Sequence, residues 1–412
     1  MEKASDRSDI LILGGGQAGA EIAMNLRQRG FAGSITLAGD EPQPPYKRPP
    51  LSKGYLSGQA KVESLHVMPP DKLAQAGIRW LGSARAARLD RVARQVELAD
   101  GRRLSYRKLA LATGGRPRAL PGVQGDNVFL LRTIADVDAI RARCAPGARV
   151  VIVGAGFIGL EAAAVLVKLG LKVTVLEALP RVLARVTVPE MSQFYEAAHR
   201  AAGVDLRTSA RIAGFDGTPA VSGVRLEGGE TVAADLIIVG IGIVPNVELA
   251  QQAALAVDNG IVVDECARTG DPDVVAAGDC TSHPSVHYGR RVRLESVQNA
   301  MEQARTAAAS LMGLSEPYQA VPWFWSDQYD LKLQMAGLST GFDRMVMRGD
   351  PAKRSFALFY LGDGKLVAAD AVNRAQDYMF ARKAIAARTP LDAAKLADES
   401  VSLKDLVPPG AA

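Results

Sequence analysis

The stretch VIVGAGFIGLEAAAV, residues 151–165, decides the fold of this 412-residue chain. An apolar run is followed by three glycines in the spacing GxGxxG, at Gly154, Gly156 and Gly159. The first glycine permits a tight turn, the second lets the backbone approach a pyrophosphate, and the third lets a helix pack closely on a strand. This second fingerprint, as we call it, predicts a strand, a turn and a helix that ends at about Leu169.

A copy of the pattern lies near the N-terminus, in ILILGGGQAGAEIAMNL at residues 10–26, which we call the first fingerprint. Its glycines have the same spacing: Gly14, Gly16 and Gly19. A strand predicted over residues 34–38 is followed by Asp40, where an acid can hydrogen-bond a ribose hydroxyl. The chain therefore has two predicted dinucleotide sites, for two copies of one ligand or for two different cofactors.

The second fingerprint also leads to an acid, because the strand predicted over residues 173–176 ends at Glu177. A 2′-phosphate carries nearly two negative charges, which this carboxylate would repel. The pattern favours NAD over NADP, although the nearby Arg181 and Arg185 leave NADP open.

Composition and cysteine usage bound the class of protein. Hydrophobic residues make up 48% and charged residues 23%, as in globular proteins. We expect neither a secretion signal in MEKASDRSD nor a transmembrane helix, because Glu161 and Lys168 interrupt the most apolar segment. The cysteines are Cys144, Cys266 and Cys280. They form no CxxC and no metal-ligand spacing, which indicates a reducing, cytoplasmic location.

The histidines and the net charge give weaker signals. His283 and His287 lie four residues apart, but Pro284 and the Tyr288-Gly289 pair predict a loop, so we expect no metal site. Lys and Arg number 49 against 44 Asp and Glu, a net charge of +5. The charges are interspersed, without the basic-aromatic pattern of a nucleic-acid surface. An acidic protein partner fits this surface, and so does solubility alone.

Two further stretches indicate that the two fingerprints bind different cofactors. LALATGG at 109–115 predicts a strand that ends in a turn of small residues. DVVAAGD at 273–279 predicts a strand that ends in an acid, Asp279. With the first fingerprint they resemble the flavoprotein disulfide reductase superfamily, which has two dinucleotide-binding domains. The resemblance implies FAD at the first site and NAD at the second, with the NAD domain inserted into the FAD domain. It also implies that Asp279 contacts the flavin's ribityl chain.

The branch of the superfamily follows from PYKRPPLSKGYL, residues 45–56, which has no cysteine where disulfide reductases carry their redox pair. RPPLSK at 48–53 is similar to the putidaredoxin-reductase-like ferredoxin reductases that serve oxygenases. Four more stretches share that resemblance: LATGGRPR (111–118), LLRT (130–133), ESVQNAMEQAR (295–305) and PWFWSDQYD (322–330).

The implied fold class is α/β, with two Rossmann-like domains and a C-terminal α+β domain. We expect the FAD domain at 1–116 and 247–322, the NAD domain at 117–246 and the C-terminal domain at 323–412. In the last of these the sequence predicts strands over 332–338, 344–348, 355–361 and 365–369 and a helix over 375–388. The Gly362-Asp363-Gly364 stretch predicts a hairpin turn.

Site residues follow from the fingerprints and the resemblance. Those expected at FAD are Gly14, Gly16, Ala18, Gly19, Asp40, Arg48, Lys53, Ala86, Thr113, Gly114, Arg132, Asp279, Val297 and Trp325. Those expected at NAD are Gly154, Gly156, Ile158, Gly159, Glu161, Glu177, Arg185 and Gly242. The catalytic residues implied are Lys53, near flavin N5 and paired with Glu161, and Trp325 at the flavin edge. Helix-end charges and core packing are the alternative roles for these three.

The implied reaction is electron transfer from NADH through FAD to an acidic 2Fe-2S ferredoxin that supplies an oxygenase. Of the oxygenase types, a haem-thiolate monooxygenase is the one we expect. The predicted docking patch consists of Arg290, Arg291, Arg293 and Arg305, where relatives place a ferredoxin-contacting arginine at the last position. A solvated basic loop, with one arginine paired to Glu295, is the alternative. Other functions left open are supply of a Rieske dioxygenase, reduction of a quinone, oxygen or a dye, and NADH sensing by association.

Overall fold

The computed structural model describes residues 7–406 and divides into two compact units. Among the described residues, unit 1 comprises 7–47, Glu63–Arg116 and Val244–Pro322. Unit 2 comprises Arg48–Val62, Pro117–Ile243 and 323–406. The outer ends of the predicted domains, at residues 1 and 412, lie outside the described residues, and the predicted domain boundaries stay predictions.

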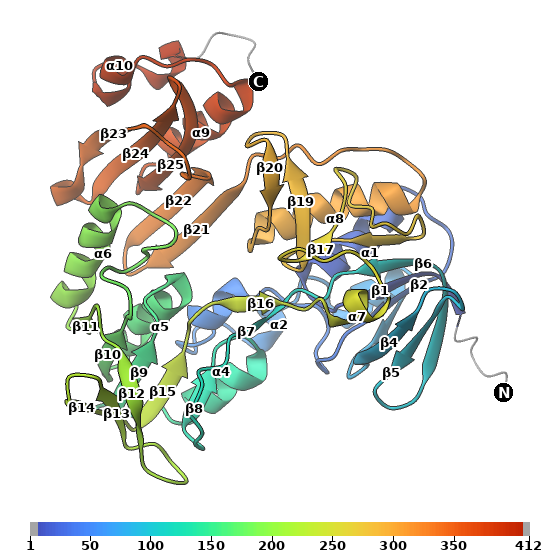
Figure 1. Ribbon diagram of the computed structural model, residues 1–412, viewed down its shortest axis with the longest axis horizontal. Helices are drawn as coiled ribbons and strands as arrows, with labels where there is room; N and C mark the ends of the chain where they lie inside the picture. Colours follow the sequence, from blue (N-terminus) through green and yellow to red (C-terminus); the bar gives the residue numbers. More distant parts are fainter. Residues whose placement is uncertain (1–6, 407–412) are drawn as a thin grey trace. The chain divides into compact units, whose positions relative to one another are not determined.

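Unit 1 is built on a sheet in the order β3-β2-β1-β6-β5-β4, with β18 paired to β6 (Figure 1). The strands are β1 Arg7–Leu13, β2 Ile35–Ala38, β3 Ile78–Leu81, β4 Ala86–Asp90, β5 Gln95–Leu98, β6 Arg103–Leu111 and β18 Val274–Ala276. Strand β1 runs parallel to both neighbours, with Leu11 opposite Thr36 and Leu109. Central strands of such a sheet are buried on both faces, which explains the apolar run before Gly14.

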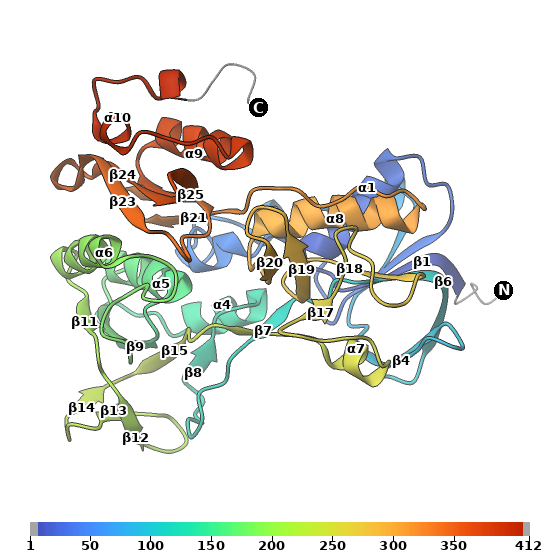
Figure 2. The same ribbon diagram turned by 45° about the horizontal axis from the view of Figure 1, so that its top comes forward.

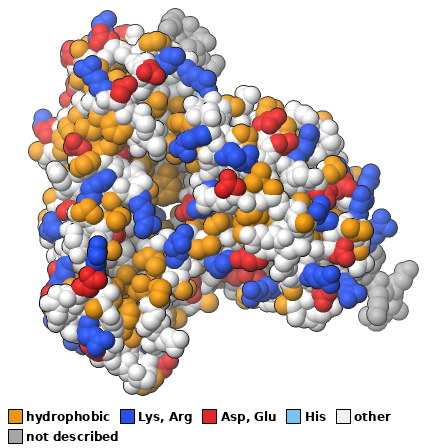
Figure 3. All heavy atoms as spheres, viewed as in Figure 1, with side chains coloured by type: hydrophobic (Ala, Val, Ile, Leu, Met, Phe, Trp, Pro, Cys, Tyr) orange, Lys and Arg blue, Asp and Glu red, His pale blue; other side chains and the backbone are white. Residues whose placement is uncertain are grey.

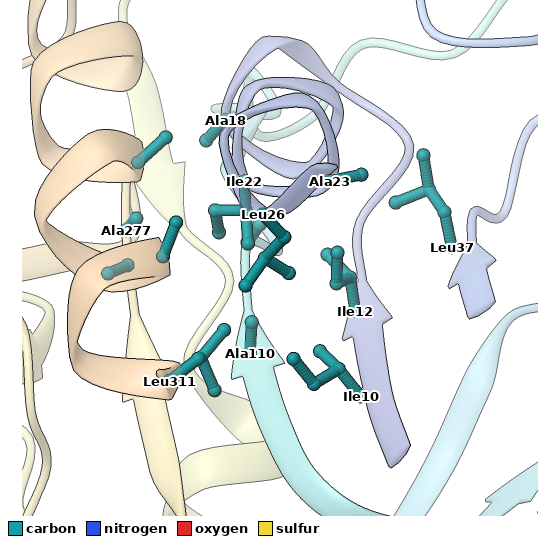
Figure 4. Close-up of a cluster of buried hydrophobic side chains, with 14 of the residues drawn as sticks. Ile10, Ile12, Ala18, Ile22, Ala23, Leu26, Leu37, Ala110, Ala277 and Leu311 are labelled. Carbon is teal, nitrogen blue, oxygen red and sulfur yellow. The ribbon is translucent and has the colours of Figure 1, made fainter. Parts of the chain in front are cut away.

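Helices α1 (Gln17–Gln28) and α8 (Val297–Leu311) pack against each other and against this sheet (Figures 1 and 2). Figure 4 shows their shared core, in which Ile22 and Leu26 of α1 point toward the strands and Leu311 of α8 lies nearby. The other elements of unit 1 are α3 Pro70–Gln75, α7 Glu248–Gln252, β17 Ile261–Val262, β19 Thr281–Ser285 and β20 Arg290–Val292, and α2 Val62–Leu65 begins at its boundary. The first fingerprint is therefore held in the core that the sheet forms with helices α1 and α8.

One local prediction in unit 1 was wrong. His283 lies in strand β19 and is only 1% exposed, whereas the sequence predicted a loop there. Pro284 is accommodated because β17 pairs only with Thr281 and Ser282, so the proline has a strand neighbour on one side alone. A proline therefore does not end the strand at this position.

Unit 2 begins with a parallel sheet in the order β11-β10-β9-β15-β8. Its strands are β8 Val128–Leu130, β9 Arg149–Val153, β10 Lys172–Leu176, β11 Asp205–Arg207 and β15 Leu236–Val239, and its helices are α4 Ile134–Arg141, α5 Phe157–Lys168 and α6 Pro189–Ala201. An antiparallel meander follows α6: β12 Ile212–Asp216, β13 Gly223–Leu226 and β14 Thr231–Ala233. Strands β7 Gly115–Pro117 and β16 Ile243–Pro245 pair with each other where the chain passes between the units.

The last part of unit 2 is an antiparallel sheet in the order β21-β22-β25-β24-β23, with α9 against it (Figure 2). The elements are β21 Trp323–Gln328, β22 Leu331–Gly337, β23 Arg344–Asp350, β24 Ser355–Gly362, β25 Lys365–Val372, α9 Ala375–Ala387 and α10 Ala393–Ala397. The predicted hairpin turn is present: Asp363 and Gly364 both have positive φ, as a two-residue type I′ turn requires.

No helix among residues 7–406 is both long enough and apolar enough to span a bilayer.

The core of unit 1 gives a first prediction. Leu26 is completely buried, whereas Leu169, at the end of the corresponding helix α5, is 37% exposed. Leu26→Ala should lower the free energy of unfolding by about 2–5 kcal/mol through lost burial and a cavity. Leu169→Ala should lower it by about 0.5 kcal/mol or less. Denaturant titrations of both variants followed by circular dichroism test this, and equal losses would contradict the packing.

Candidate functional site

The turn of the first fingerprint is a place where two stretches of backbone nearly touch. Gly14 has φ +124°, and a Cβ there would lie 1.9 Å from the Ala112 carbonyl oxygen. A Cβ on Gly19 would lie 2.0 Å from the Gly14 carbonyl oxygen. Backbone cannot move aside as a flexible side chain can, so both positions exclude every other residue. The contact also places the turn next to Thr113 and Gly114, which follow β6.

The second fingerprint repeats this geometry in unit 2. A Cβ on Gly154, which has φ +105°, would lie 2.5 Å from the Gly240 carbonyl oxygen. A Cβ on Gly159 would lie 2.1 Å from the Gly154 carbonyl oxygen. The two turns are therefore the same construction, each built from its own strand and helix.

The middle glycines need a different explanation. A Cβ on Gly16 or Gly156 would meet no protein atom within 4 Å, so packing of the chain does not require glycine there. Each is the N-cap of its helix, and neither helix has a side-chain cap or an acid in its first turn. By contrast Thr133 and Ser296 cap helices α4 and α8 with their side chains. Exposed amides at a helix N-terminus bind anions, and the pyrophosphate of a dinucleotide fits both turns.

The two predicted acids follow their strands as expected, but they are held differently. Asp40 follows β2 and is exposed. Both oxygens of Glu177 accept backbone hydrogen bonds, from Ala155 N and from Leu179 N, each at 2.8 Å. Because Ala155 lies inside the second fingerprint, the Glu177 carboxylate is fixed beside that turn.

The two arginines near Glu177 differ in availability. Arg181 donates hydrogen bonds to Thr187 O, Ser192 Oγ and Ala184 O, so its guanidinium belongs to the fold. Arg185 is exposed. Of the two residues that left NADP open, Arg185 is the candidate for a 2′-phosphate contact.

Two further stretches with predicted FAD residues, one ending at Asp279 and one leading to Ala86, lie near the first fingerprint in unit 1. Ala18 lies against Gly278, where a Cβ would be 3.0 Å from the Ala18 methyl, and this brings Asp279 beside the first turn of α1. Ala84 N donates to Gly39 O at 2.7 Å, which places the segment before Ala86 next to Asp40. Val297 is the first residue of α8.

In unit 2 Lys53 and Glu161 form the ion pair that the resemblance implied. Lys53 Nζ lies 2.6 Å from Glu161 Oε2, and Glu161 is 2% exposed. Glu161 also accepts hydrogen bonds from Ser52 Oγ, at 2.5 Å to Oε2, and from Ser326 Oγ, at 2.7 Å to Oε1. A buried carboxylate costs free energy unless it is paired and hydrogen-bonded, and this one has a cation and two hydroxyls.

The serine partners of Glu161 were missed by the sequence analysis. Ser52 lies in the short 3₁₀ helix Pro49–Ser52 within RPPLSK, and Ser326 lies in β21. The available signal was the strand pattern WFWSDQ, in which Ser326 lies on the same face as Phe324. At such a position a buried strand usually has an apolar residue, so the serine indicates a polar partner.

Three more predicted site residues lie in the same unit: Arg48, Arg132 and Trp325. Arg48 Nη1 donates to Arg132 O at 2.5 Å, so this pair joins the RPPLSK and LLRT stretches. Trp325 and Trp323 face the same side of β21 as predicted, with ring centroids 5.6 Å apart, and the Arg382 guanidinium lies 5.5 Å from the Trp323 ring. Both tryptophans are partly exposed, so neither is a fully buried core residue.

The structure divides the predicted arginine patch. Arg291 donates to the carbonyls of Val263 and Ser282, and Arg293 pairs with Glu295 at 2.5 Å, as the alternative interpretation expected. Arg290, Arg291 and Arg305 are exposed, and Arg293 is partly buried. Arg305 lies 3.2 Å from Glu302. Two of the four arginines, Arg291 and Arg293, therefore also make contacts within the fold, and the assignment of the patch to a partner stays a prediction.

Comparisons with known proteins decide the family. Residues 8–304 match the family described as "Pyridine nucleotide-disulphide oxidoreductase", and residues 323–407 match "Reductase C-terminal". The chain belongs to the pyridine nucleotide-disulphide oxidoreductases. Membership confirms the predicted fold class. It also confirms that the protein is an oxidoreductase that uses FAD and a nicotinamide dinucleotide.

Individual relatives match nearly end to end. Putidaredoxin reductase of Pseudomonas putida is 46% identical over 407 residues, covering 97% of this chain and 96% of the relative. The ferredoxin–NAD(+) reductase component of the anthranilate 1,2-dioxygenase system of Burkholderia cepacia is 42% identical, covering 96% and 98%. The crystal structure of the covalent putidaredoxin reductase–putidaredoxin complex superimposes with a TM-score of 0.94, at 46% identity and 98% coverage of each chain. The predicted resemblance to putidaredoxin-reductase-like proteins is confirmed.

The middle glycine of the first fingerprint gives a second prediction. Gly16→Ala should weaken FAD binding by about tenfold or more, because the methyl keeps the pyrophosphate from the helix amides. The apoprotein should lose about 1 kcal/mol or less, the effect of a poorer N-cap. Titration of apoprotein with FAD, followed by flavin fluorescence, measures the change. Gly270→Ala is the control, because Gly270 also has open space around it but lies in an exposed turn. Unchanged FAD affinity in Gly16→Ala would place the pyrophosphate elsewhere.

Proposed function

We propose that this protein is an NADH-dependent, FAD-containing ferredoxin reductase that passes electrons to an acidic 2Fe-2S ferredoxin supplying an oxygenase. The observation that carries the proposal is the pair of uncapped, glycine-lined helix N-termini together with the buried Lys53–Glu161 pair. Full-length similarity to a putidaredoxin reductase and to a dioxygenase-system reductase supports the ferredoxin as partner. The three free cysteines support a cytoplasmic location.

The proposed division of labour follows the predicted domains, with FAD at 1–116 and 247–322 and NAD at 117–246. Bound FAD would supply the hydride acceptor and the centre that releases electrons singly. The amides of α1 and α5 hold the two pyrophosphates, and Asp40 and Glu177 orient the riboses. Hydride transfer needs no side-chain acid or base, so the chain acts through position and charge.

Lys53 is the proposed electrostatic residue. A cation near the flavin ring favours the anionic reduced form. Because Glu161 lies 2.6 Å away, it fixes the position of the ammonium group and partly neutralises it. The pair therefore sets how strongly the charge acts on the flavin.

The oxygenase supplied by the ferredoxin is proposed to be a haem-thiolate monooxygenase. Support comes from the motifs PWFWSDQYD and RPPLSK and from 46% identity to putidaredoxin reductase. A Rieske-type dioxygenase is the second candidate, supported by the relative from the anthranilate 1,2-dioxygenase system at 42% identity.

Arg305 is the proposed ferredoxin contact. It is 61% exposed on α8, and its guanidinium lies 3.2 Å from Glu302. Its charge acts against burial, which raises the pKa of Glu21, and with Arg29, which lowers the pKa of Glu316. Because Arg29 pairs with Glu316, charges of both signs surround Arg305. On the face drawn in Figure 3 basic and acidic side chains are likewise interspersed. A partner carboxylate would therefore be recognised by one or two arginines rather than by a broad basic field.

The cofactor preference gives the third prediction. NADH should reduce the flavin far more efficiently than NADPH, because the fixed Glu177 carboxylate repels a 2′-phosphate. Stopped-flow reduction at several concentrations of each nucleotide measures it. Glu177→Gln should narrow the preference, whereas Glu63→Gln, a control in the short helix α2, should leave it unchanged. Equal efficiency with NADH and NADPH would overturn the assignment.

Ferredoxin docking gives the fourth prediction. Arg305→Ala should raise the KM for ferredoxin about tenfold, a loss of about 1–3 kcal/mol, and flatten its salt dependence. The assay is ferredoxin-dependent cytochrome c reduction at several ionic strengths, with ferricyanide reduction by NADH reporting intact flavin chemistry. Arg103→Ala is the matched control, because Arg103 is 67% exposed and lies near Glu97 in the same unit. An unchanged KM in Arg305→Ala would move the interface elsewhere.

A further inference from the structure

Strand β21 presents an unusual face to the helices of unit 2. Side chains two residues apart on a strand share a face, and on this one Phe324 contacts Phe157, Ser326 contacts Glu161 and Gln328 contacts His199. Figure 1 shows β21 beside α5 and α6, which carry these three partners. Ser326 and Gln328 are 0% and 1% exposed, so two successive polar residues are buried on one face. Such burial is costly unless every polar atom finds a partner.

The polar atoms of this face form one connected chain. Ser326 Oγ lies 2.7 Å from Glu161 Oε1, and Gln328 Nε2 lies 3.1 Å from Ser326 Oγ. Gln328 Oε1 lies 2.8 Å from His199 Nε2, and His199 Nδ1 lies 2.9 Å from Tyr329 OH. The chain leads from the carboxylate that pairs with Lys53 to a tyrosine on the turn after β21.

Proton positions along the chain are determined from its charged end. The Glu161 carboxylate, paired with Lys53, can only accept, so the Ser326 hydroxyl must donate to it. The hydroxyl oxygen then accepts from the Gln328 amide, and the Gln328 carbonyl faces His199. Burial lowers the pKa of His199, so the ring is neutral, donates from Nε2 and accepts the Tyr329 proton at Nδ1. One arrangement satisfies every member.

We infer that Ser326 is a positioning residue for the proposed reductase: with Gln328 and His199 it holds the Glu161 carboxylate in the orientation in which it neutralises Lys53. The inference rests on the proposed role of Lys53 at the flavin. Its distinctive consequence is that a residue of the C-terminal sheet sets the flavin potential, through a neighbour of the proposed flavin-edge residue Trp325. A buried polar network that served folding alone would not have this effect.

The test is a double-mutant cycle on the flavin midpoint potential. Lys53→Met should lower the potential, because the cation is lost. Ser326→Ala should raise it, because the Glu161 carboxylate is no longer held at Oε1 and can turn away from Lys53, which it then neutralises less well. The equilibrium constant for flavin reduction by NADH should rise roughly three- to tenfold. In the Lys53→Met background the Ser326→Ala shift should vanish.

Controls separate the possible failures. Ser310→Ala removes a buried hydroxyl that donates to Cys266 O at 2.6 Å, and it should leave the potential unchanged. If Lys53→Met shifts the potential and Ser326→Ala does not, or if the Ser326→Ala shift persists without Lys53, the inference is wrong and the proposed function stands. If Lys53→Met leaves the potential unchanged, the proposed role of Lys53 fails, and the inference fails with it. Should Ser326→Ala not retain FAD, Ser326→Cys, a weaker donor of similar size, should shift the potential in the same direction.

A second measurement does not depend on the flavin. Nitrogen-15 NMR of the four histidines should show His199 neutral at pH 7 with its proton on Nε2. In Ser326→Ala the Gln328 amide loses its acceptor and the preference for this tautomer should weaken. A proton on Nδ1 in the wild-type protein would contradict the hydrogen-bond order and overturn the inference.

Discussion

Two close backbone contacts determine how the helix of each fingerprint is placed on its strand, and the two candidate binding sites depend on them. In each fingerprint a carbonyl of the turn passes within about 2 Å of where a side chain would begin, at Gly19 from Gly14 and at Gly159 from Gly154. This proximity brings each helix N-terminus to the end of its strand, with its amides exposed and no side chain capping them. The same construction therefore occurs twice, and in the proposed function each turn binds a pyrophosphate while the residues around it determine which dinucleotide binds.

The second organising feature is one buried charge. Glu161 lies in the second turn of α5, four residues after Phe157, so the helix that begins at the second fingerprint also places the carboxylate. Lys53, Ser52 and Ser326 reach it from RPPLSK and from β21. A buried carboxylate needs several partners, and here they come from three segments far apart in the sequence. In the proposed function this charge connects the NAD helix, the loop that carries Lys53 and the C-terminal sheet.

The sequence predicted the parts whose signal is local. Both fingerprints, the strand Arg149–Val153, the Asp363-Gly364 turn and the shared face of Trp323 and Trp325 depend on neighbours within a few residues. What it missed depends on contacts between distant segments: Ser326 has no motif of its own, and no local signal showed that Arg291 bonds to Val263 and Ser282. His283 was expected in a loop because the one-sided pairing that tolerates Pro284 is a property of the sheet.

The central claim is that electrons pass from NADH through the flavin to a 2Fe-2S ferredoxin. Sequential-mixing stopped-flow tests it most directly: the enzyme is reduced anaerobically with one equivalent of NADH and then mixed with an oxidised 2Fe-2S ferredoxin. The account predicts rapid reoxidation of the flavin with two ferredoxin molecules reduced per flavin, slowed at high salt. A reduced flavin that does not react with the ferredoxin but is rapidly reoxidised by a quinone or by oxygen would contradict it.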